Sequence, residues 1–584
     1  MTVDLILPMV FNLVGGLGIF LLGMKYMQQG LQVVAGPRIR KMINAVTSNR
    51  FLAVGIGLSV TTLVQSSSVT SVMVIGFVNS QLMALNGAIG VIMGANIGTT
   101  ITGWMLALKI GKYGLPIVGL SAFGWLFLKK EKFRYTALAL LGIGMVFFGL
   151  ELMKDGFKPL NDHPEFNAMF NVFQATNYFG VLKAAFVGCL LTVIVQSSSA
   201  TLGITIALAN TGVIDFHTAA ALVLGENIGT TITAFLASLG ADDINAKRAA
   251  YFHVIFNVLG VAWITALFHP VYIPFIIKIV IGADPNTMVT VTGADPNTQT
   301  ATETYPYMTS AIAAVHSGFN IANVLLFLPF TTFFANLLTR LVKSKGKARR
   351  DYLTHLDFQV GTSPLAAIEQ SRSEISRMDF RVREMMDNLR TIMVDNEDGQ
   401  DSQELRDQVF EREEILDKVQ IEVTTFLTNL LARSISYELA EEARAQLRLA
   451  DEYESVSDYI TNVLKLRLRL QDANVKLSKE QQQELVELHD AVATYHNLVQ
   501  GGLRSDSPTR YLRRMRKESN KITDRIRGLR DIHWHRLSSE KVEPLISTSY
   551  MDIVGAYRRI KDHLLNIGEA NVGGRSLDSE ASDG

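Results

Sequence analysis

The sequence predicts an all-α protein: a polytopic membrane half with inverted repeats and two re-entrant hairpins, followed by a soluble helical-bundle domain. Up to Val342, the 584-residue chain is dominated by apolar runs of about twenty residues or more, the length that spans a bilayer. Beyond this point, Glu, Arg, Leu and Ile alternate with the period of amphipathic helices. Two polar tetrads and their neighbouring motifs also occur twice, in the same order.

The full-length apolar runs predict membrane spans at 8–30, 82–108, 113–128, 135–153, 216–239, 249–280 and 307–340. Two more apolar segments, 51–79 and 181–209, are interrupted by Gln-Ser-Ser-Ser tetrads. If both segments crossed the membrane, the basic loops 36–50 and 129–134 would lie on opposite sides, against the positive-inside rule. We therefore expect both to be hairpins that enter and leave by one face.

This topology predicts a multi-pass protein of the cell inner membrane, with its N-terminus outside and its C-terminal domain in the cytoplasm. The expected domains are a transport domain at 1–342, a linker at 343–362, a helical domain at 363–570 and a disordered tail at 571–584. Within the first, repeat one covers about 8–130, repeat two about 135–280, and the final span 307–340. The single cysteine, Cys189, excludes a disulfide framework, and the net charge of +0 gives no reason to expect a nucleic-acid partner.

The internal repeat rests on three ordered matches. Gly16-Leu17-Gly18 recurs as Gly142-Ile143-Gly144, the tetrad Gln65 to Ser68 recurs as Gln196 to Ser199, and Gly94 to Thr100 recurs as Gly225 to Thr231. Because the first repeat crosses the membrane an odd number of times, the second must be inverted. Inverted repeats with broken helices are typical of secondary transporters, whose site lies near the midplane.

Each tetrad would place a hairpin turn at membrane depth, which is costly unless it lines a polar cavity. The helix leaving the turn would direct its free N–H groups and positive dipole end at the cavity, an arrangement that suits an anion. Serine and glutamine also hold membrane helices together, which is the structural alternative. A serine nucleophile has no support, because there is no GxSxG motif and neither tetrad has a base nearby, so we do not expect an enzyme.

The motif G-x-N-I-G-T-T is expected to interrupt spans 82–108 and 216–239. Its glycines would loosen the helix, and its polar residues would add neutral oxygens of the kind that bind sodium: Asn96, Thr99, Thr100, Asn227, Thr230 and Thr231. Thr102 and Thr233 follow on the same side. Close helix packing is the alternative role. Glu226 is an acid inside a span, so it could ligate a cation, carry a proton or lie at a water boundary.

The paired tetrads and G-x-N-I-G-T-T motifs, with His253 to Asn257 and His316 to Asn320, resemble the type II sodium-phosphate cotransporter family over about residues 10–335. The His-x-x-Phe-Asn pair itself is expected to be structural. The resemblance implies phosphate contacts from Gln65, Ser66, Ser67, Ser68, Gln196, Ser197, Ser198 and Ser199. It also implies a sodium site at Gln196, Ser197, Thr230 and Thr233, and a pseudo-symmetric site at Gln65, Ser66, Thr99 and Thr102; Asn96, Glu226 and Asn227 complete the candidate sodium ligands.

Two departures from this family matter. Its members usually have a small residue where Glu226 stands, which could alter sodium binding here. Electrogenic animal members carry an Asp in a His-x-x-Phe-Asn-like stretch after the first repeat, and this chain has no such stretch between Ile101 and Phe133. Electroneutral coupling to two sodium ions is the resulting hypothesis.

The soluble half is expected to form six helices near 363–393, 402–433, 438–471, 478–502, 508–530 and 545–570. It resembles the PhoU family over about 360–570, which implies regulation of phosphate uptake and metal binding through ExxxD motifs. Glu454 and Asp458 lie at i and i+4 on one helical face, and Asp562 is the matching acid of a second copy. These three are the candidates for a divalent metal site, with an ordinary solvated face as the alternative.

The expected function is sodium-dependent import of inorganic phosphate by alternating access, regulated by the PhoU-like domain. The alternative is a phosphate receptor that binds without transport and signals through that domain. The expected partners are phosphate, sodium ions and the lipid bilayer, without nucleic acid, and a homodimer is left open.

Overall fold

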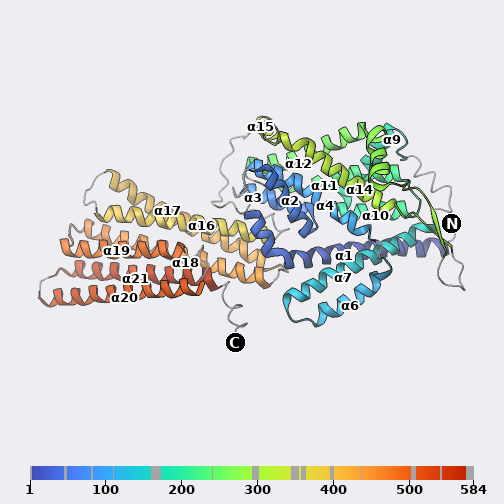
Figure 1. Cartoon of the computed structure of the whole chain (residues 1–584). Coiled ribbons are helices and arrows are strands. Elements are labelled where there is room, and N and C mark those ends of the chain that lie inside the picture. The colour runs from blue at the N-terminus through green and yellow to red at the C-terminus, as the bar shows by residue number, and fades with distance from the viewer. Residues whose placement is uncertain are drawn as a thin grey trace. The chain divides into compact units, whose positions relative to one another are not determined.

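The computed structural model (Figure 1) describes the chain except residues 1–2, 45–48, 80–82, 109–110, 160–172, 240, 242, 293–300, 344–353, 355, 357–363, 395–399, 434, 436, 502–507, 540–541 and 574–584. It divides into two compact units, Met1–Gly346 and Lys347–Gly584. This division falls inside the segment 343–362. Most of the segment 571–584 lies outside the described residues, but its first three residues are helical rather than disordered.

The first unit is built from helices that are listed here in chain order: α1 (Val3–Asn44), α2 (Arg50–Val64), α3 (Ser67–Asn79), α4 (Leu85–Thr99), α5 (Ile101–Leu106), α6 (Gly114–Phe127), α7 (Glu131–Phe157), α9 (Tyr178–Val195), α10 (Ser198–Asn210), α11 (Phe216–Leu239), α12 (Ile244–Ala266), α14 (Met308–Phe327) and α15 (Thr331–Leu341). Within the described residues, seven stretches are long and apolar enough to cross a membrane: Leu7–Gly36, Leu85–Leu106, Glu131–Phe157, Tyr178–Val195, Phe216–Leu239, Ile244–Ala266 and Met308–Leu341. The first unit is therefore a multi-pass membrane protein.

The structure corrects the span expected at 249–280. Helix α12 ends at Ala266, and two π-helical turns follow, Phe268–Tyr272 and Ile276–Ile281, with the short α13 (Ile273–Phe275) between them. Pro270 and Pro274 have no N–H to donate to the preceding turn, so a regular α-helix cannot continue through them.

Two more details differ from the expected boundaries. Helix α1 continues through the basic segment that was expected to be a loop at 36–50, and it ends only at Asn44. After the π-helical turns, β1 (Val289–Thr292) pairs antiparallel with β2 (Ala301–Thr304), with Val289 opposite Thr304. This two-stranded ribbon is an addition to an otherwise helical described structure.

Helices α1 and α7 show the inverted repeat directly, because they run alongside one another (Figure 1) and their contacts are reciprocal. Gly16 packs against Gly149, and Gly23 packs against Gly142. In the repeat, Gly142 is the counterpart of Gly16, and Gly149 is the counterpart of Gly23. Gly16 therefore contacts the counterpart of Gly23, and Gly23 contacts the counterpart of Gly16. Reciprocal contacts of this kind are expected for two elements related by a two-fold axis.

The hairpin arms are also packed equivalently in the two repeats. α2 lies along α4 as α9 lies along α11. Gly57 lies on the carbonyl of Val91, and its counterpart Gly188 lies on the carbonyl of Leu222. A Cβ at either glycine would overlap that carbonyl, so the sequence needs glycine there for the two backbones to approach.

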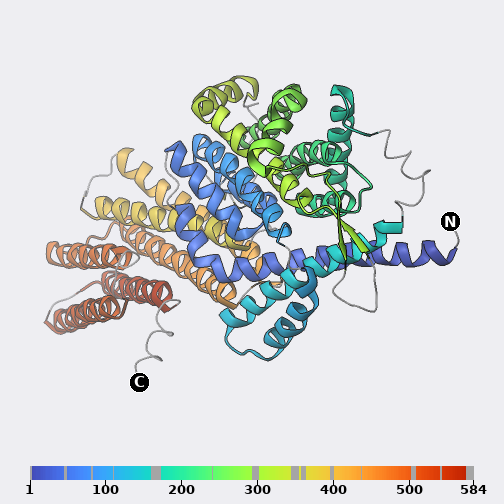
Figure 2. The same ribbon diagram turned by 45° about the vertical axis from the view of Figure 1, so that its right-hand side comes forward.

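The second unit contains α16 (Pro364–Val394), α17 (Gln400–Leu431), α18 (Tyr437–Asp472), α19 (Lys479–Gly501), α20 (Pro508–Ser539) and α21 (Pro544–Gly573). α16, α17 and α18 form one three-helix bundle, α19, α20 and α21 form another, and α18 packs on α21 (Figure 2). Their buried stripes of Leu, Ile, Val and Met form a continuous core. These helices therefore agree with the six expected ones to within a few residues, except that α20 runs nine residues further.

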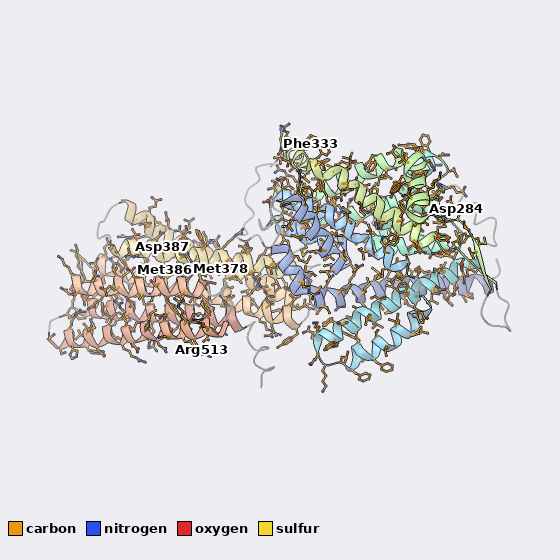
Figure 3. The ribbon with its side chains drawn as sticks, viewed as in Figure 1. Asp284, Phe333, Met378, Met386, Asp387 and Arg513 are labelled. Atoms are coloured by element: carbon orange, nitrogen blue, oxygen red, sulfur yellow. The ribbon has the colours of Figure 1, made fainter. Side chains whose placement is uncertain are left out.

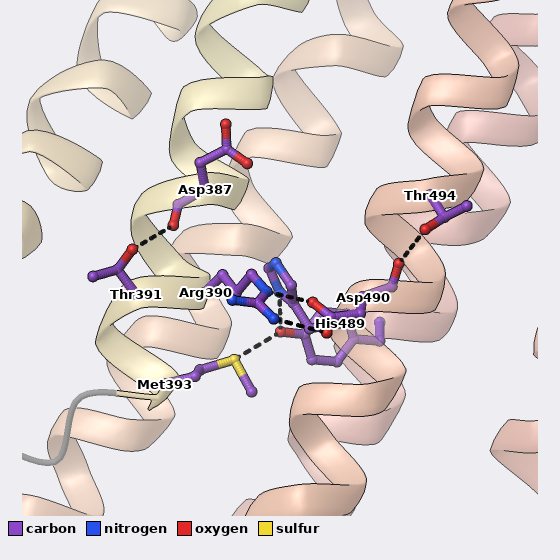
Figure 4. A network of polar contacts seen from close by, with 8 residues as sticks. Asp387, Arg390, Thr391, Met393, His489, Asp490 and Thr494 are labelled. Atoms are coloured by element: carbon purple, nitrogen blue, oxygen red, sulfur yellow. Dashed lines mark hydrogen bonds and ion pairs between the residues drawn. The ribbon is translucent and has the colours of Figure 1, made fainter.

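A polar network ties α16, α19 and α21 together inside this unit (Figure 4). Arg390 donates two hydrogen bonds to Asp490, at 2.6 and 3.1 Å. Beneath this ion pair, the Tyr557 hydroxyl lies 2.9 Å from Nδ1 of His489 and 3.2 Å from the Met393 sulfur. Burial lowers the pKa of His489 to about 4, so the imidazole is neutral at pH 7.

Candidate functional site

Each tetrad begins with a glutamine in the left-handed conformation, and this residue turns the hairpin. Gln65 and Gln196 both have φ 56°, and their backbone N–H groups donate to the carbonyls of Thr61 and Thr192. This conformation costs a non-glycine residue roughly 1–2 kcal/mol. Finding it at two matched positions shows that the tetrads are turns between helices rather than parts of straight spans.

The second residue of each tetrad caps the outgoing helix. The Ser66 hydroxyl accepts from the Val69 N–H, and the Ser197 hydroxyl accepts from the Ala200 N–H, both at 3.2 Å. These caps follow from the local sequence. Serine is a favoured N-cap residue, because its hydroxyl oxygen can accept a hydrogen bond from the N–H three residues later.

The last two serines of each tetrad have hydroxyl groups that form no hydrogen bonds within the described structure. Ser67 and Ser68 lie in the first turn of α3, and Ser198 and Ser199 lie in the first turn of α10. The first N–H groups of a helix also lack intrahelical acceptors, so each tip presents hydroxyls, amides and the positive end of a helix dipole.

The two tips differ in how their glutamines are held. The Gln65 side chain is buried; its amide donates to the Thr62 carbonyl at 2.7 Å and accepts from the Thr102 hydroxyl at 3.0 Å. Gln196 is exposed, and Thr233, the counterpart of Thr102, donates to the Thr230 carbonyl instead, at 3.1 Å. The structure therefore joins Gln65 to Thr102 but does not join Gln196 to Thr233.

Helix α5 lies next to both hairpins. Thr102 binds the first tip, and the adjacent Gly103 lies against Leu202 on α10, where a Cβ would be 3.4 Å from the leucine side chain. Leu202 is one turn beyond Ser198. The first tip and the first turns of α10 therefore contact the same short helix.

The expected interruption of span 216–239 by its G-x-N-I-G-T-T motif is wrong, because α11 is continuous from Phe216 to Leu239. Its glycines serve packing: Gly225 and Gly229 lie on the carbonyls of Ala185 and Cys189 in α9. In the first repeat, α4 ends at Thr99 and α5 begins at Ile101, so the motif there does contain a helix boundary.

The threonines of both motifs hydrogen-bond to their own helices. The Thr99 hydroxyl donates to the Ala95 carbonyl at 3.0 Å, and the Thr230 hydroxyl donates to the Glu226 carbonyl at 2.9 Å. Each hydroxyl donates its proton to a backbone carbonyl, so the lone pairs of the hydroxyl oxygen remain available to bind a cation.

The second His-x-x-Phe-Asn motif positions Asn227. Asn320 donates to the Asn227 side-chain oxygen at 3.2 Å, and Nε2 of His316 lies 3.3 Å from the same oxygen. All three side chains are buried. His and Asn at i and i+4 lie on one helical face, which is why this spacing can hold a single carboxamide. The motif thus connects α14 to α11.

Glu226 is enclosed by protein rather than placed at a water boundary. Its side chain is 1% exposed. One carboxyl oxygen accepts from the Thr205 hydroxyl at 2.8 Å, and the other has no partner among the described residues. The repeat places Ala95 and Val74 at the corresponding positions, so this polar pair exists in the second repeat alone. The sequence pattern did not identify Thr205, because only the fold brings α10 and α11 together there.

In the second unit, Glu454 and Asp458 lie close to another acid. Burial raises the pKa of both carboxyl groups, and the negative charge of Asp417 on α17 raises both further. Asp417 was not singled out, although Glu413 and Asp417 repeat the i, i+4 spacing of Glu454 and Asp458.

The third expected metal ligand has other partners. Asp562 is ion-paired with Lys561 and lies 3.9 Å from Arg558. Among the described residues, no group of three or more His, Cys, Asp or Glu side chains could hold a metal ion.

Replacing Asp458 by Asn should raise the melting temperature of the second unit at pH 7. The folded-state pKa lies above the unfolded value of about 4, so the wild type loses stability as pH rises through the folded pKa, and the Asn variant does not. Because the group is largely exposed, the gain should stay below about 1 kcal/mol, or roughly 2–4 °C. Thermal unfolding at pH 4 and pH 7 checks this; an equal gain at both pH values would contradict it.

Comparisons with known proteins match both units. The model of the Na+/Pi-cotransporter family matches residues 19–155 and 166–282, and that of the PhoU domain matches residues 375–466. The uncharacterized protein YqeW of Bacillus subtilis is 31% identical over 328 residues, which are 56% of this chain and 96% of that protein. No solved structure matches.

Two other relatives have names that describe a function. YjbB of Salmonella typhimurium, provisionally named an inorganic phosphate export protein, is 23% identical over 94% of this chain and 95% of its own length. Human sodium-dependent phosphate transport protein 2B is 39% identical over 98 residues, which are 16% of this chain and 14% of that protein.

Proposed function

Because the chain belongs to the Na+/Pi-cotransporter family and carries a PhoU domain, we propose that it imports inorganic phosphate together with sodium ions by alternating access. The observation that carries this proposal is the matched pair of hairpin tips, each with a left-handed glutamine, a capping serine and two serines whose hydroxyls form no hydrogen bonds among the described residues. The second unit would regulate uptake.

Phosphate would be held by the tips without a buried Lys or Arg. The hydroxyls of Ser67, Ser68, Ser198 and Ser199 can each donate to a phosphate oxygen, as can the free N–H groups of the same turns. Gln65, Ser66, Gln196 and Ser197 complete the proposed contacts. Hydrogen bonds to a charged acceptor are the stronger kind, so a few of them can hold a divalent oxyanion.

Sodium would bind where each tip meets the G-x-N-I-G-T-T motif of its repeat. The proposed ligands are Gln65, Ser66, Asn96, Thr99 and Thr102 in the first repeat, and Gln196, Ser197, Glu226, Asn227, Thr230 and Thr233 in the second. The Gln65–Thr102 bond and the back-bonded threonines support these groups, since hydroxyl oxygens with free lone pairs are suitable sodium ligands.

Replacing Glu226 by Gln should raise the sodium concentration for half-maximal uptake about tenfold, equivalent to about 1.4 kcal/mol. The substitution keeps the shape and the bond from Thr205 but replaces the second carboxyl oxygen, a proposed sodium ligand, by an amide nitrogen that cannot bind a cation. The phosphate KM at saturating sodium should not change. The sodium dependence of phosphate uptake, with Ala95→Ser in the first repeat as a control, checks this; an unchanged sodium requirement would remove Glu226 from the proposed ligands.

Uptake of radiolabelled phosphate into proteoliposomes tests the proposed function. An inward sodium gradient should drive accumulation, and its removal should abolish accumulation. A membrane potential should have little effect if coupling to two sodium ions is electroneutral. Phosphate binding without accumulation would favour the alternative of a phosphate receptor.

The direction of transport needs its own measurement, because YjbB, which matches both units, has a name that describes export. A symporter runs in the direction that the sodium and phosphate gradients together favour, so an inward sodium gradient should give import. Preloaded vesicles should release phosphate when the sodium gradient is reversed. Release that needs no sodium would replace the symport proposal with efflux.

A further inference from the structure

Helix α20 carries a stripe of four basic residues near its start, which we call the basic stripe: Arg510, Arg513, Arg514 and Lys517. All four are exposed, and none forms an ion pair or hydrogen bond within the described part of the chain. Their spacing of three, four and seven residues places them on one face of the helix. Figure 3 shows Arg513 at the outer edge of the second unit.

Several other basic residues of the same helix differ, because they have acidic partners. Arg516 pairs with Glu569 at 2.8 Å, and Lys521 pairs with Glu518 at 2.8 Å. Arg527 pairs with Asp524 at 3.1 Å. Among the described residues, the basic stripe is therefore a concentration of positive charge without ion-pair partners; Arg514 and Lys517 act on Glu518 only at longer range and lower the pKa of its carboxyl group.

The stripe borders a groove of about 770 Å³ between α19 and α20. Arg514 lies at its rim, and Tyr495, Leu498 and Ile522 form an apolar floor. The acids that line the groove already have partners: Glu487 with Arg525, Asp490 with Arg390, and Glu518 with Lys521. The unpaired charge at this groove is therefore the positive charge of Arg514.

The second unit, which contains α20, is joined in sequence to the first unit. The first unit carries the membrane-crossing helices, and 22 residues lie between the end of α15 and the start of α16, a segment that can extend over at most about 80 Å. A cluster of four or more Lys and Arg residues on an amphipathic helix is typical of a site for anionic headgroups, and the second unit is tethered to a membrane by the first.

We propose that the basic stripe of α20 docks the second unit on anionic phospholipid, with the phosphate of a headgroup at Arg514 and its glycerol end over the apolar floor of the groove. Near a membrane surface each Lys or Arg strengthens the attraction to anionic lipid roughly fivefold. Together the four should make docking strong in anionic membranes and weak in neutral ones.

The test uses the full chain in vesicles. With Cys189 replaced by Ser, a donor dye at Asn520→Cys, exposed on α20, reports proximity to lipids that carry an acceptor on their headgroups. In vesicles with phosphatidylglycerol, energy transfer should be high at low salt, and about 0.5 M salt should reduce it, since that screens charges beyond a few ångströms. In phosphatidylcholine vesicles transfer should be low.

Two variants make the test specific. Replacing the four stripe residues by Gln should reduce the transfer in phosphatidylglycerol to the level seen in phosphatidylcholine. The matched control replaces four exposed basic residues elsewhere in the unit, Arg383, Arg469, Lys476 and Lys479, and should leave the transfer unchanged.

Equal transfer for the stripe variant and the wild type, or no dependence on phosphatidylglycerol, would overturn the proposal. Loss of transfer on adding millimolar inorganic phosphate at constant ionic strength would also overturn it, because free phosphate would then be the ligand. None of these readings depends on whether the protein transports phosphate.

Discussion

Replacing Ser67 and Ser198 together by Ala should reduce sodium-driven phosphate uptake at least 100-fold while leaving the thermal stability unchanged. Neither hydroxyl has a partner within the described structure, so its removal breaks no bond inside the protein. In the proposed complex each donates to a phosphate oxygen, and a hydrogen bond to a charged group contributes about 1.5–3 kcal/mol. Each single variant should therefore lose about tenfold or more in kcat/KM.

The capping serines provide the comparison. Ser66→Ala and Ser197→Ala remove an N-cap as well as a proposed ligand, so they should lose about 1 kcal/mol of stability in addition to uptake. Uptake at several phosphate concentrations, together with thermal unfolding, separates the capping serines, Ser66 and Ser197, from Ser67 and Ser198. Full uptake by the Ser67→Ala/Ser198→Ala variant would show that phosphate does not bind between these turns.

Replacing Gly57 by Ala should inactivate the protein and lower its stability by several kcal/mol. The new Cβ would overlap the Val91 carbonyl, so α2 would have to move away from α4 and carry the first tip with it. Overpacking of a close contact costs typically about 1–3 kcal/mol and can cost more where backbone must shift. Its counterpart Gly188→Ala should behave alike, because it meets the Leu222 carbonyl in the same way.

Gly55 is the matched control, two residues earlier on the same helix. A Cβ at Gly55 meets no atom within 4 Å. Gly55→Ala should therefore be neutral or stabilising by up to about 1 kcal/mol, since Ala is the better helix former. The fraction of folded protein in detergent and the phosphate uptake of both variants check the pair. Equal behaviour of Gly55→Ala and Gly57→Ala would contradict the close packing of α2 on α4.

Much of the hairpin geometry could be predicted from sequence because the signals are local. A Gln-Ser-Ser-Ser tetrad inside an apolar run combines a polar interruption with a favoured N-cap, and both signals act within four residues. The left-handed conformation of the glutamine is not such a signal, because glutamine has no preference for it. The two-fold relation was also predictable, since glycines at matched positions repeat the same packing requirement in α1 and α7. The membrane character of the first unit and the six helices of the second follow from composition and periodicity.

Other features depend on residues that are distant in the sequence. The G-x-N-I-G-T-T glycines were expected to loosen two helices, but in α11 they allow close contact with α9, and a glycine pattern alone does not distinguish these roles. Pairings such as Glu226 with Thr205 and Asn227 with Asn320 need helices to be placed beside one another. Local chemistry therefore specified the turns, caps and spans, whereas the partners of the buried polar groups were set by helix packing, because an isolated sequence pattern does not tell which side chains share the same interior space.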